Sequence, residues 1–325
     1  MNRNFAVGCL CIALATLVFS SMEVVLKLPA VAGAFHPVQI TMERFLVGGL
    51  CLIPVAAHTL KKKGVSLTAA DLGYFAMTGF LNICLGMVLF QLAVTVGQAN
   101  IVAVIFSGNP IFVTVLAAII LHETIRWNNI LALVFDILGI LIIVNPLGSG
   151  QANPLSVTLT VLSALLFALY SVLGKKKTAK VGSIVVTCCS FLFGSLELCL
   201  LLLLGHWEPV AAGLEPVGLG IFAHVPFFQG LNPQTLPHFL FVSIVNTAAG
   251  YVFHMLAIEK TSAIHGSLVF FFKPILAPIF ALLILGEAIT PNIAAGIAMF
   301  LVGSLLGMVP AILRNRHPKE VPHHE

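Results

Sequence analysis

The sequence has 325 residues, of which 59% are hydrophobic and only 9% are charged, with a mean hydropathy of +1.07 and a formal net charge of +4. A soluble domain carries roughly 25% charged residues, so this chain has too few polar side chains to cover an apolar core. The composition excludes a soluble globular protein and predicts an all-α membrane protein with the lipid bilayer as its solvent.

Ten apolar stretches are each close to the roughly 20 residues that a helix needs to cross a bilayer. Their approximate bounds are 5–28, 37–57, 72–94, 99–120, 128–146, 154–174, 183–204, 236–257, 262–285 and 291–312. The first stretch is followed by Ala30-Val31-Ala32, which loosely resembles the cleavage site of a signal peptide. We expect it to remain as a membrane helix, because it is too long for an ordinary signal core.

Lysine and arginine are concentrated in alternate loops between these stretches. One set of loops and both chain ends hold Arg3, Lys61, Lys62, Lys63, Arg126, Lys175, Lys176, Lys177, Lys180, Lys260, Arg314, Arg316 and Lys319. The other set holds at most Lys27, and the loop at 205–235 holds none. Short loops rich in lysine and arginine stay in the cytoplasm, so we expect both termini to be cytoplasmic. This bias accounts for the net charge and does not suggest a nucleic-acid partner.

The chain contains a long internal repeat. A shift of 164 residues places the third, fourth and fifth stretches on the eighth, ninth and tenth, and it pairs Asn82 with Asn246, Gly86 with Gly250, Ala93 with Ala257, Pro110 with Pro274, Glu123 with Glu287, Gly139 with Gly303 and Pro146 with Pro310. Because five spans per half is an odd number, the second half must be inverted relative to the first. We therefore predict ten transmembrane helices as two inverted five-helix repeats, at 1–147 and 148–316, followed by a polar C-terminal tail at 317–325.

The two halves share a pattern that is typical of a known family. Each half has an apolar helix with a central proline, then a glutamate, then a glycine-bearing final helix. The two copies read Asn109-Pro110-Ile111-Phe112 and Lys273-Pro274-Ile275-Leu276, and the second stretch carries Pro37 and Arg44. This pattern resembles the EamA-type branch of the drug/metabolite transporter superfamily. The resemblance implies a ten-helix inverted-repeat fold and the export or exchange of small metabolites, without a particular substrate.

A candidate substrate site lies where prolines interrupt the helices. Pro110 and Pro274 lie near the middle of the fourth and ninth stretches, and each removes a backbone donor from its helix. Paired interruptions at corresponding positions point to the binding site of a transporter. The alternative is a pair of structural kinks that contact no ligand.

Lys273 directly precedes Pro274 and lies at bilayer depth, whereas its repeat counterpart Asn109 is neutral. A central charge in a membrane is costly, so it should face a cavity or a partner. We expect Lys273 to bind an anionic group of the substrate, such as a carboxylate. The alternative is a structural ion pair with Asp136 or Glu197.

Other polar side chains at mid-membrane depth are further candidates for substrate binding. Asn82 and Asn246 form a symmetric pair that either contacts substrate or clamps neighbouring helices together. His254 breaks the repeat symmetry, because its counterpart is a phenylalanine, and it either carries a proton or bonds a neighbouring helix. Tyr170 can line an amphipathic cavity with the aromatic run at 270–272, although phenylalanines more commonly face lipid.

A second polar group is expected near the outer surface. Glu23 and Lys27 are four residues apart and are predicted to pair along one helix. With Glu43 and Arg44 they either gate access by ion pairing or extend toward the lipid headgroups. Glu23 also resembles the first-helix carboxylate of small four-helix drug pumps in the same superfamily, which implies a proton-coupling role.

Glu123 and Glu287 fall where one helix ends and the next begins. Carboxylates favour the N-terminus of a helix, so we expect each to stabilise the N-terminus of the helix that follows it. We therefore assign both glutamates to the architecture of the protein and not to its substrate site.

No metal site and no cofactor are predicted. The cysteines all lie inside apolar stretches without metal-ligand spacing, where they pack as small apolar residues: Cys9, Cys11, Cys51, Cys84, Cys188, Cys189 and Cys199. The sequence also lacks a Walker motif, so ATP does not drive the protein directly.

These features predict a secondary active transporter that exports a small amino-acid-like or amphipathic metabolite by alternating access. We expect a multi-pass protein of the bacterial cytoplasmic membrane, as a monomer or homodimer. The alternative is a proton-coupled extruder of drugs or cations that uses Glu23. An intramembrane enzyme and a channel are more remote alternatives, because the sequence has neither a catalytic motif nor a filter-like repeat.

Overall fold

The computed structural model describes residues 3–144, 152–216 and 218–316, and these residues form helices and no strand. The first half contains α1 (Arg3–Ser20), α2 (Met22–Lys27), α3 (Pro29–Ala32), α4 (Pro37–Lys63), α5 (Ala69–Gly79), the π-helix η1 (Phe80–Met87), α6 (Val88–Val96), α7 (Ala99–Phe106), α8 (Asn109–Leu121) and α9 (Trp127–Val144). The second half contains α10 (Pro154–Val181), α11 (Ser183–Leu204), α12 (Glu208–Leu214), the 3-10 helix η2 (Gly220–Phe222), α13 (Leu236–Leu240), the π-helix η3 (Phe241–Ala249), α14 (Gly250–Lys260), α15 (Ala263–Gly266), the 3-10 helix η4 (Ser267–Phe270), α16 (Lys273–Phe280), the π-helix η5 (Ala281–Leu285) and α17 (Pro291–Arg316). The predicted boundary between 147 and 148 and the predicted tail at 317–325 lie outside the described residues.

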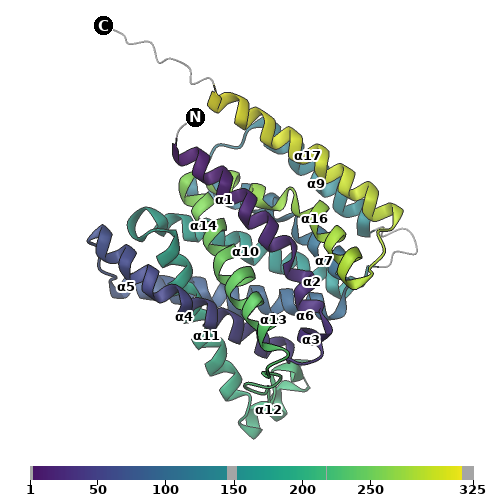
Figure 1. The fold of residues 1–325 in the computed structure, drawn as a ribbon. Coiled ribbons are helices and arrows are strands. Elements are labelled where there is room, and N and C mark those ends of the chain that lie inside the picture. The colour runs from purple at the N-terminus through teal and green to yellow at the C-terminus, as the bar shows by residue number, and fades with distance from the viewer. Residues whose placement is uncertain (1–2, 145–151, 217, 317–325) are drawn as a thin grey trace.

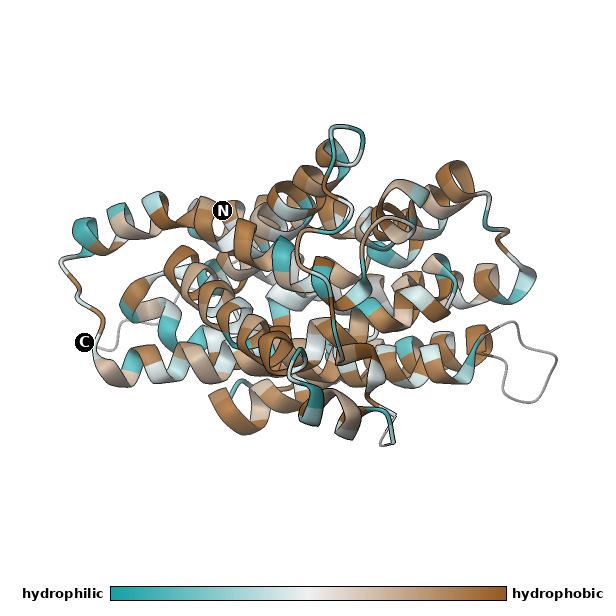
Figure 2. Cartoon of the chain, turned by 90° about the horizontal axis from the view of Figure 1, so that it is seen from below, coloured by the Kyte–Doolittle hydropathy of each residue, from teal (hydrophilic) through white to brown (hydrophobic). Residues whose placement is uncertain are grey.

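Nine helical segments of the described chain are long and apolar enough to cross a membrane: Asn4–Lys27, Pro37–Lys63, Ala69–Val96, Ala99–Leu121, Trp127–Val144, Pro154–Val181, Ser183–Leu204, Leu236–Lys260 and Ala263–Leu285. A shorter apolar stretch, Pro291–Gly303, begins α17. Large apolar side chains such as Ile119 and Leu283 point outward, with 66% and 75% of their surface exposed. Hydrophobic residues predominate along the helices, and many hydrophilic residues lie near helix ends and in loops (Figure 2). The all-α membrane protein predicted from composition is therefore confirmed, whereas the orientation of its termini stays a prediction.

The helices of the two halves pack against each other and not only among themselves. In Figure 1, α1 of the first half lies beside α14 of the second. Conversely, α10 of the second half packs against η1 and α6 of the first. Repeat-related glycines lie at these contacts, because Gly86 faces Leu166 on α10 and Gly250 faces Phe19 on α1. The third span therefore packs on the sixth, and the eighth packs on the first.

Both the fourth and the ninth spans are broken near their middles. In the fourth span α7 ends at Phe106 and α8 begins at Asn109. In the ninth span η4 ends at Phe270 and α16 begins at Lys273. Pro110 and Pro274 are each the second residue of the new helix, where the missing proline N–H leaves no intrahelical hydrogen bond unmade. The two breaks therefore place Asn109 and Lys273 at equivalent helix starts in the interior.

The fifth span, α9, packs side by side with α17, which was predicted as the tenth span, at one edge of the molecule (Figure 1). The repeat-related Gly139 and Gly303 lie at their contact. A Cβ added at Gly139 would lie 3.0 Å from the Gly296 carbonyl oxygen, and one added at Gly303 would lie 2.9 Å from the Ala132 carbonyl oxygen. The absence of side chains at both positions therefore allows the two backbones to approach closely.

Candidate functional site

The break in the ninth span places Lys273 against Glu23 of α2. Lys273 Nζ donates a hydrogen bond to Glu23 Oε1, and the two side chains are only 2% and 0% exposed. Neither of the two carboxylates considered from the sequence is its partner. Asp136 lies instead beside Gly303 at the contact of α9 with α17, and Glu197 lies on α11. The pair links the two repeats in the interior of the protein.

The predicted pair between Glu23 and Lys27 along one helix is wrong. The first span is interrupted at Ser21, between α1 and α2. Glu23 and Lys27 both follow this interruption on α2, but the Glu23 side chain is fully buried and bonds Lys273. Lys27 instead donates to the Gly97 carbonyl oxygen and lies 3.5 Å from a carboxylate oxygen of Glu287. Glu23 is therefore an interior residue and not part of an outer vestibule.

A small aromatic cavity adjoins the buried ion pair. Its volume is about 20 Å³, and its walls are Phe19, Met22, Met87, Phe90, Phe106, Phe167, Tyr251, Phe270 and Lys273. Lys273 Nζ lies 4.9 Å from the centre of the Phe106 ring and 5.9 Å from the centres of the Phe90 and Phe270 rings. These distances allow cation–π attraction. The cavity has room for about one water molecule, so a metabolite can enter only if the surrounding helices move.

Arg44 adds a second positive charge to the interior. Its side chain is fully buried, 3.1 Å from Met22 Sδ and 4.6 Å from the centre of the Phe45 ring. It interacts electrostatically with Glu23 and Tyr251 but forms no ion pair within 4 Å among the described residues. Arg44 and Lys273 therefore both interact with the single carboxylate of Glu23. This excess of positive charge favours the binding of an added negative group.

The remaining polar candidates near the break hold helices together. The Asn109 side chain donates to the Ala164 carbonyl oxygen at 2.7 Å. His254 Nε2 lies 3.0 Å from Ser171 Oγ, and the imidazole packs 5.1 Å from the Phe167 ring. Both contacts reach α10, so these side chains fix the sixth span beside the cavity.

Tyr170 and Asn82 are buried behind the cavity wall. The Tyr170 ring packs 6.2 Å from the Phe167 ring and 6.0 Å from the Tyr251 ring, and Tyr170 itself does not line the cavity. Asn82, in the π-helix η1, lies beside the Tyr251 hydroxyl. Neither candidate is among the residues that line the cavity.

Asn246 occupies the corresponding π-helix of the second half, η3. Its amide donates to the Val18 carbonyl oxygen at 2.7 Å and to Ser21 Oγ at 2.9 Å. These bonds reach the point where α1 gives way to α2. Asn246 therefore clamps the eighth span to the junction of α1 and α2, which directly precedes Glu23.

Glu43 lies apart from the ion pair and anchors a loop. Its Oε1 accepts hydrogen bonds from Gln39 Nε2 and from the Phe228 backbone N–H, both at 3.0 Å. Gln39 also donates to the Gln229 carbonyl oxygen at 2.9 Å. Within the described chain Glu43 forms no ion pair with Arg44. The long loop after α11 is thereby tied to the start of α4.

The glutamates at the repeat ends stabilise helices, but not the helices that follow them. Glu123 accepts hydrogen bonds from the backbone N–H groups of Ala263 and Ile264, at 2.9 and 3.2 Å. Glu287 accepts them from Ala99 and Asn100, at 3.0 and 2.9 Å. Each carboxylate therefore caps the first turn of the broken span in the opposite repeat. The prediction of a structural role was correct in kind and wrong about which helix is capped.

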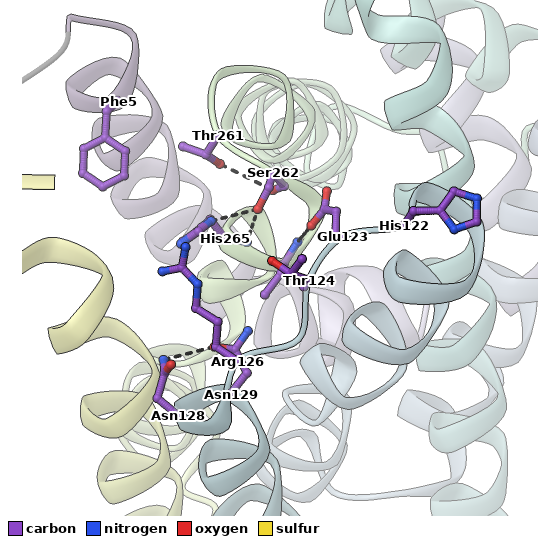
Figure 3. Close-up of a pocket in the computed structure, with 11 residues that line it drawn as sticks. Phe5, His122, Glu123, Thr124, Arg126, Asn128, Asn129, Thr261, Ser262 and His265 are labelled. Atoms are coloured by element: carbon purple, nitrogen blue, oxygen red, sulfur yellow. Dashed lines mark hydrogen bonds between the residues drawn. The ribbon is translucent and has the colours of Figure 1, made fainter. Parts of the chain in front are cut away.

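A larger cavity opens beside Glu123. It has a volume of about 510 Å³, and its lining includes Phe5, His122, Glu123, Thr124, Arg126, Asn128, Asn129, Thr261, Ser262, Ile264 and His265. Arg126 extends toward His265 and Ser262, whereas His122 points away from them (Figure 3). This end of the protein, called the Glu123 face, also holds the start of α1. The opposite end, called the Glu287 face, holds Lys27 and the end of α2.

Of the aromatic run at 270–272 that was considered for a cavity wall, Phe270 lines the central cavity, but the other phenylalanines of the wall were missed by sequence reasoning. Phe19, Phe106 and Phe167 come from three different spans, and no local pattern separates them from phenylalanines that face lipid. Only the approach of α1, α7 and α10 gathers them around Lys273.

Comparison with known proteins identifies the family. The model of the EamA-like transporter family matches residues 6–145 and 154–309. The chain belongs to this family. The resemblance read from the two proline-containing repeats is therefore confirmed, and the chain is a multi-pass membrane protein of a transporter family.

Several relatives of this EamA-like protein are named as transporters. An uncharacterized transporter of Clostridium kluyveri is 34% identical over 304 residues, covering 92% of each chain. An S-adenosylmethionine uptake transporter of Rickettsia prowazekii is 24% identical over 171 residues, covering 53% of this chain and 56% of the relative. A crystal structure 16% identical in sequence covers 94% of this chain and 98% of its own, with a TM-score of 0.65. The names point to a transporter and not an enzyme, and the crystal structure supports the fold alone.

Proposed function

We propose that this EamA-like protein is a secondary active transporter that exports a small amphipathic metabolite with an amino-acid-like head. The observation that carries the proposal is the buried pair of Lys273 and Glu23, which lies at the break of the ninth span beside an aromatic cavity. Substrates of inverted-repeat transporters bind near the midplane, where discontinuous helices meet.

The two charges suit the two ends of a zwitterionic head. A charge at the centre of a membrane costs about 2.5–3.5 kcal/mol on an insertion scale, so each partner keeps the other neutralised in the empty protein. A substrate carboxylate takes the place of Glu23 beside Lys273, and a substrate ammonium group takes the place of Lys273 beside Glu23. Arg44 supports the carboxylate, because it adds an uncompensated positive charge to the same interior.

The apolar part of the substrate is held by the aromatic wall. Phe106 and Phe270 flank Lys273, and Phe19 and Phe167 pack edge to face with 6.3 Å between ring centres. The cavity of about 20 Å³ must widen before a metabolite fits. Alternating access supplies that widening if the halves rock about the breaks at residues 107–108 and 271–272.

The relative from Rickettsia prowazekii supports the substrate class. S-adenosylmethionine is an amino-acid derivative, and the named uptake transporter shares about half of its length with this chain. We keep export as the proposed direction in a bacterial cytoplasmic membrane, with both termini in the cytoplasm. Uptake is the alternative direction that a flux measurement must exclude.

A second candidate function is proton-coupled extrusion of cations. It is favoured by the burial of Glu23, because an interior carboxylate can bind a cation and a proton in turn. The two functions differ in what Lys273 does. A zwitterion exporter requires its charge, whereas a cation extruder works without it.

The proposal is tested by counterflow in proteoliposomes. Substrates are first chosen by comparing the metabolites retained by cells with and without the protein. Lys273→Met and Glu23→Gln are then compared with Lys61→Met, which removes an exposed lysine in the last turn of α4. We expect both interior variants to lose at least about 100-fold in transport efficiency, because removing one partner leaves the other buried charge unpaired. Lys61→Met should transport normally.

Three outcomes would contradict this function. Full transport by Lys273→Met at all substrate concentrations would remove Lys273 from the site. Retention of lipophilic cations, and not amino-acid-like solutes, in cells lacking the protein would favour the cation extruder. Ohmic conductance without saturation would indicate a channel instead of a carrier.

A further inference from the structure

Two lysines occupy corresponding positions in the two repeats. A shift of 148 residues places the first span on the sixth and pairs Leu17 with Leu165, Phe19 with Phe167, Val24 with Val172 and Lys27 with Lys175. The pairing is also structural, because Phe19 and Phe167 both line the central cavity. Lys27 and Lys175 therefore lie at equivalent depths of inverted halves, one toward each face.

At the Glu287 face, Lys27 closes a contact between three elements. Its Nζ donates to the carbonyl oxygen of Gly97, directly after α6, and it lies 3.5 Å from a carboxylate oxygen of Glu287. Glu287 in turn caps the first turn of α7 through Ala99 and Asn100. Lys27 therefore joins α2 to the α6–α7 connection and to the end of the ninth span.

At the Glu123 face, Lys175 makes the equivalent backbone contact without the ion pair. Its Nζ donates to the carbonyl oxygen of Ile258 and lies 3.5 Å from that of Thr261. Thr261 is the repeat counterpart of Gly97, because the two are 164 residues apart. Lys175 interacts electrostatically with Glu123. However, no ion pair within 4 Å joins them in the described part of the chain.

The cavities follow the same asymmetry. The cavity of about 510 Å³ opens at the Glu123 face and is lined by Glu123, Thr261 and Ile264. At the opposite face Asn100, the repeat counterpart of Ile264, is fully buried. The face with the completed lysine–glutamate pair is therefore closed at this position, and the face without it is open.

We propose that Lys27–Glu287 and Lys175–Glu123 are alternating latches, of which one forms when its own face closes and the other breaks. The structure is then the state closed at the Glu287 face. This inference rests on the proposed alternating-access transport, but it concerns gating and not the substrate. Both lysines already touch the backbone near their glutamates, so only a local movement of the side chain and helix end completes or breaks each pair.

The latches are tested with single-cysteine reporters of accessibility. Asn100→Cys reports on the Glu287 face and Ile264→Cys on the Glu123 face, each in a background without the native cysteines. Each reporter is combined with Lys27→Met, with Lys175→Met or with Lys61→Met as the control. The rate of labelling by a membrane-impermeant maleimide is measured in detergent solution, where both faces are accessible and no substrate is needed.

The two latch variants should shift the reporters in opposite directions. Lys27→Met should raise labelling of Asn100→Cys and lower that of Ile264→Cys, by about 2- to 5-fold, the size expected for a partly exposed ion pair. Lys175→Met should do the reverse, and the double variant should return toward the parent. Lys27→Arg and Lys175→Arg should restore the parent rates, which excludes general damage to the fold.

Shifts in the same direction, or shifts no larger than those of Lys61→Met, would overturn the latch proposal. This failure is separate from failure of the proposed function. If Lys273→Met transports normally while the reporters still shift oppositely, the substrate site is wrong and the latches stand. If Lys273→Met is inactive but the reporters do not respond, only the latches are wrong.

Discussion

Replacing Lys273 by methionine leaves the buried carboxylate of Glu23 without its partner, and we expect this to lower the free energy of unfolding by about 3–5 kcal/mol. The two side chains are 2% and 0% exposed, so solvent does not screen the loss. Two charges about 4 Å apart attract each other by about 4 kcal/mol at an effective dielectric constant of about 20, which agrees with that range. Arg44 is too far away to form a replacement ion pair without moving.

The measurement is equilibrium unfolding in mixed micelles, followed by the helical circular dichroism signal. Lys27→Met is the matched control, because the Lys27 and Glu287 side chains are 29% and 14% exposed, and we expect a cost of at most about 1 kcal/mol. The double variant Lys273→Met/Glu23→Leu removes both charges and should lie within about 1 kcal/mol of the parent protein.

The reasoning would be refuted by either of two results. A cost below about 1 kcal/mol for Lys273→Met would mean that Glu23 gains another partner or that the pair is solvated. A double variant that is as unstable as the two single variants combined would mean that the side chains act independently. In both cases the charges at this break would not form the coupled pair on which the proposed substrate site depends.

Three further predictions concern the scaffold, and thermal unfolding in detergent measures all of them. Glu123→Ala should cost about 0.5–2 kcal/mol because it removes a helix cap. Glu287→Ala should cost more than Glu123→Ala, since Glu287 also pairs with Lys27; equal costs would argue against that pair. Gly139→Ala should cost about 1–3 kcal/mol, because its Cβ would lie 2.9 Å from the Phe300 ring. Gly73→Ala is its control and should be neutral or stabilising, since nothing lies within 4 Å of a Cβ there; equal effects at both glycines would contradict close packing at the α9–α17 contact.

The sequence predicted those parts of the fold that depend on a local pattern or on the repeat. Apolar stretches located the spans because lipid-facing helices must be apolar along most of their length. Pro110 and Pro274 located the interruptions because proline cannot continue a helix as other residues do. Gly139 and Gly303 were recognised as a matched pair, although their contact across α9 and α17 followed only from the structure.

Side-chain partners could not be predicted in the same way. Glu23 and Lys27 are one turn apart on α2, a spacing that allows a pair along the helix, but Glu23 instead pairs with Lys273 of the other repeat. The interruption at Ser21 carries no proline or glycine that would mark it, and Asn246 of the other repeat holds it in place. Glu123 and Glu287 were assigned to the helices that follow them because sequence proximity is the only guide before the halves are placed together.

The two repeats share a scaffold but divide the chemistry unequally. With the first span placed on the sixth, Glu23 corresponds to Ser171, just as Lys273 corresponds to Asn109. Each half therefore contributes one member of the charged pair, and the related position in the other half is neutral, since Ser171 bonds His254 and Asn109 bonds the Ala164 carbonyl. An inverted repeat needs symmetry to exchange its two open states, but a substrate with one head and one tail needs an asymmetric site. In the proposed alternating-access transport, confining the charges to α2 and α16 would meet both requirements, because the moving helices would remain equivalent while the bound head would have only one place to lie.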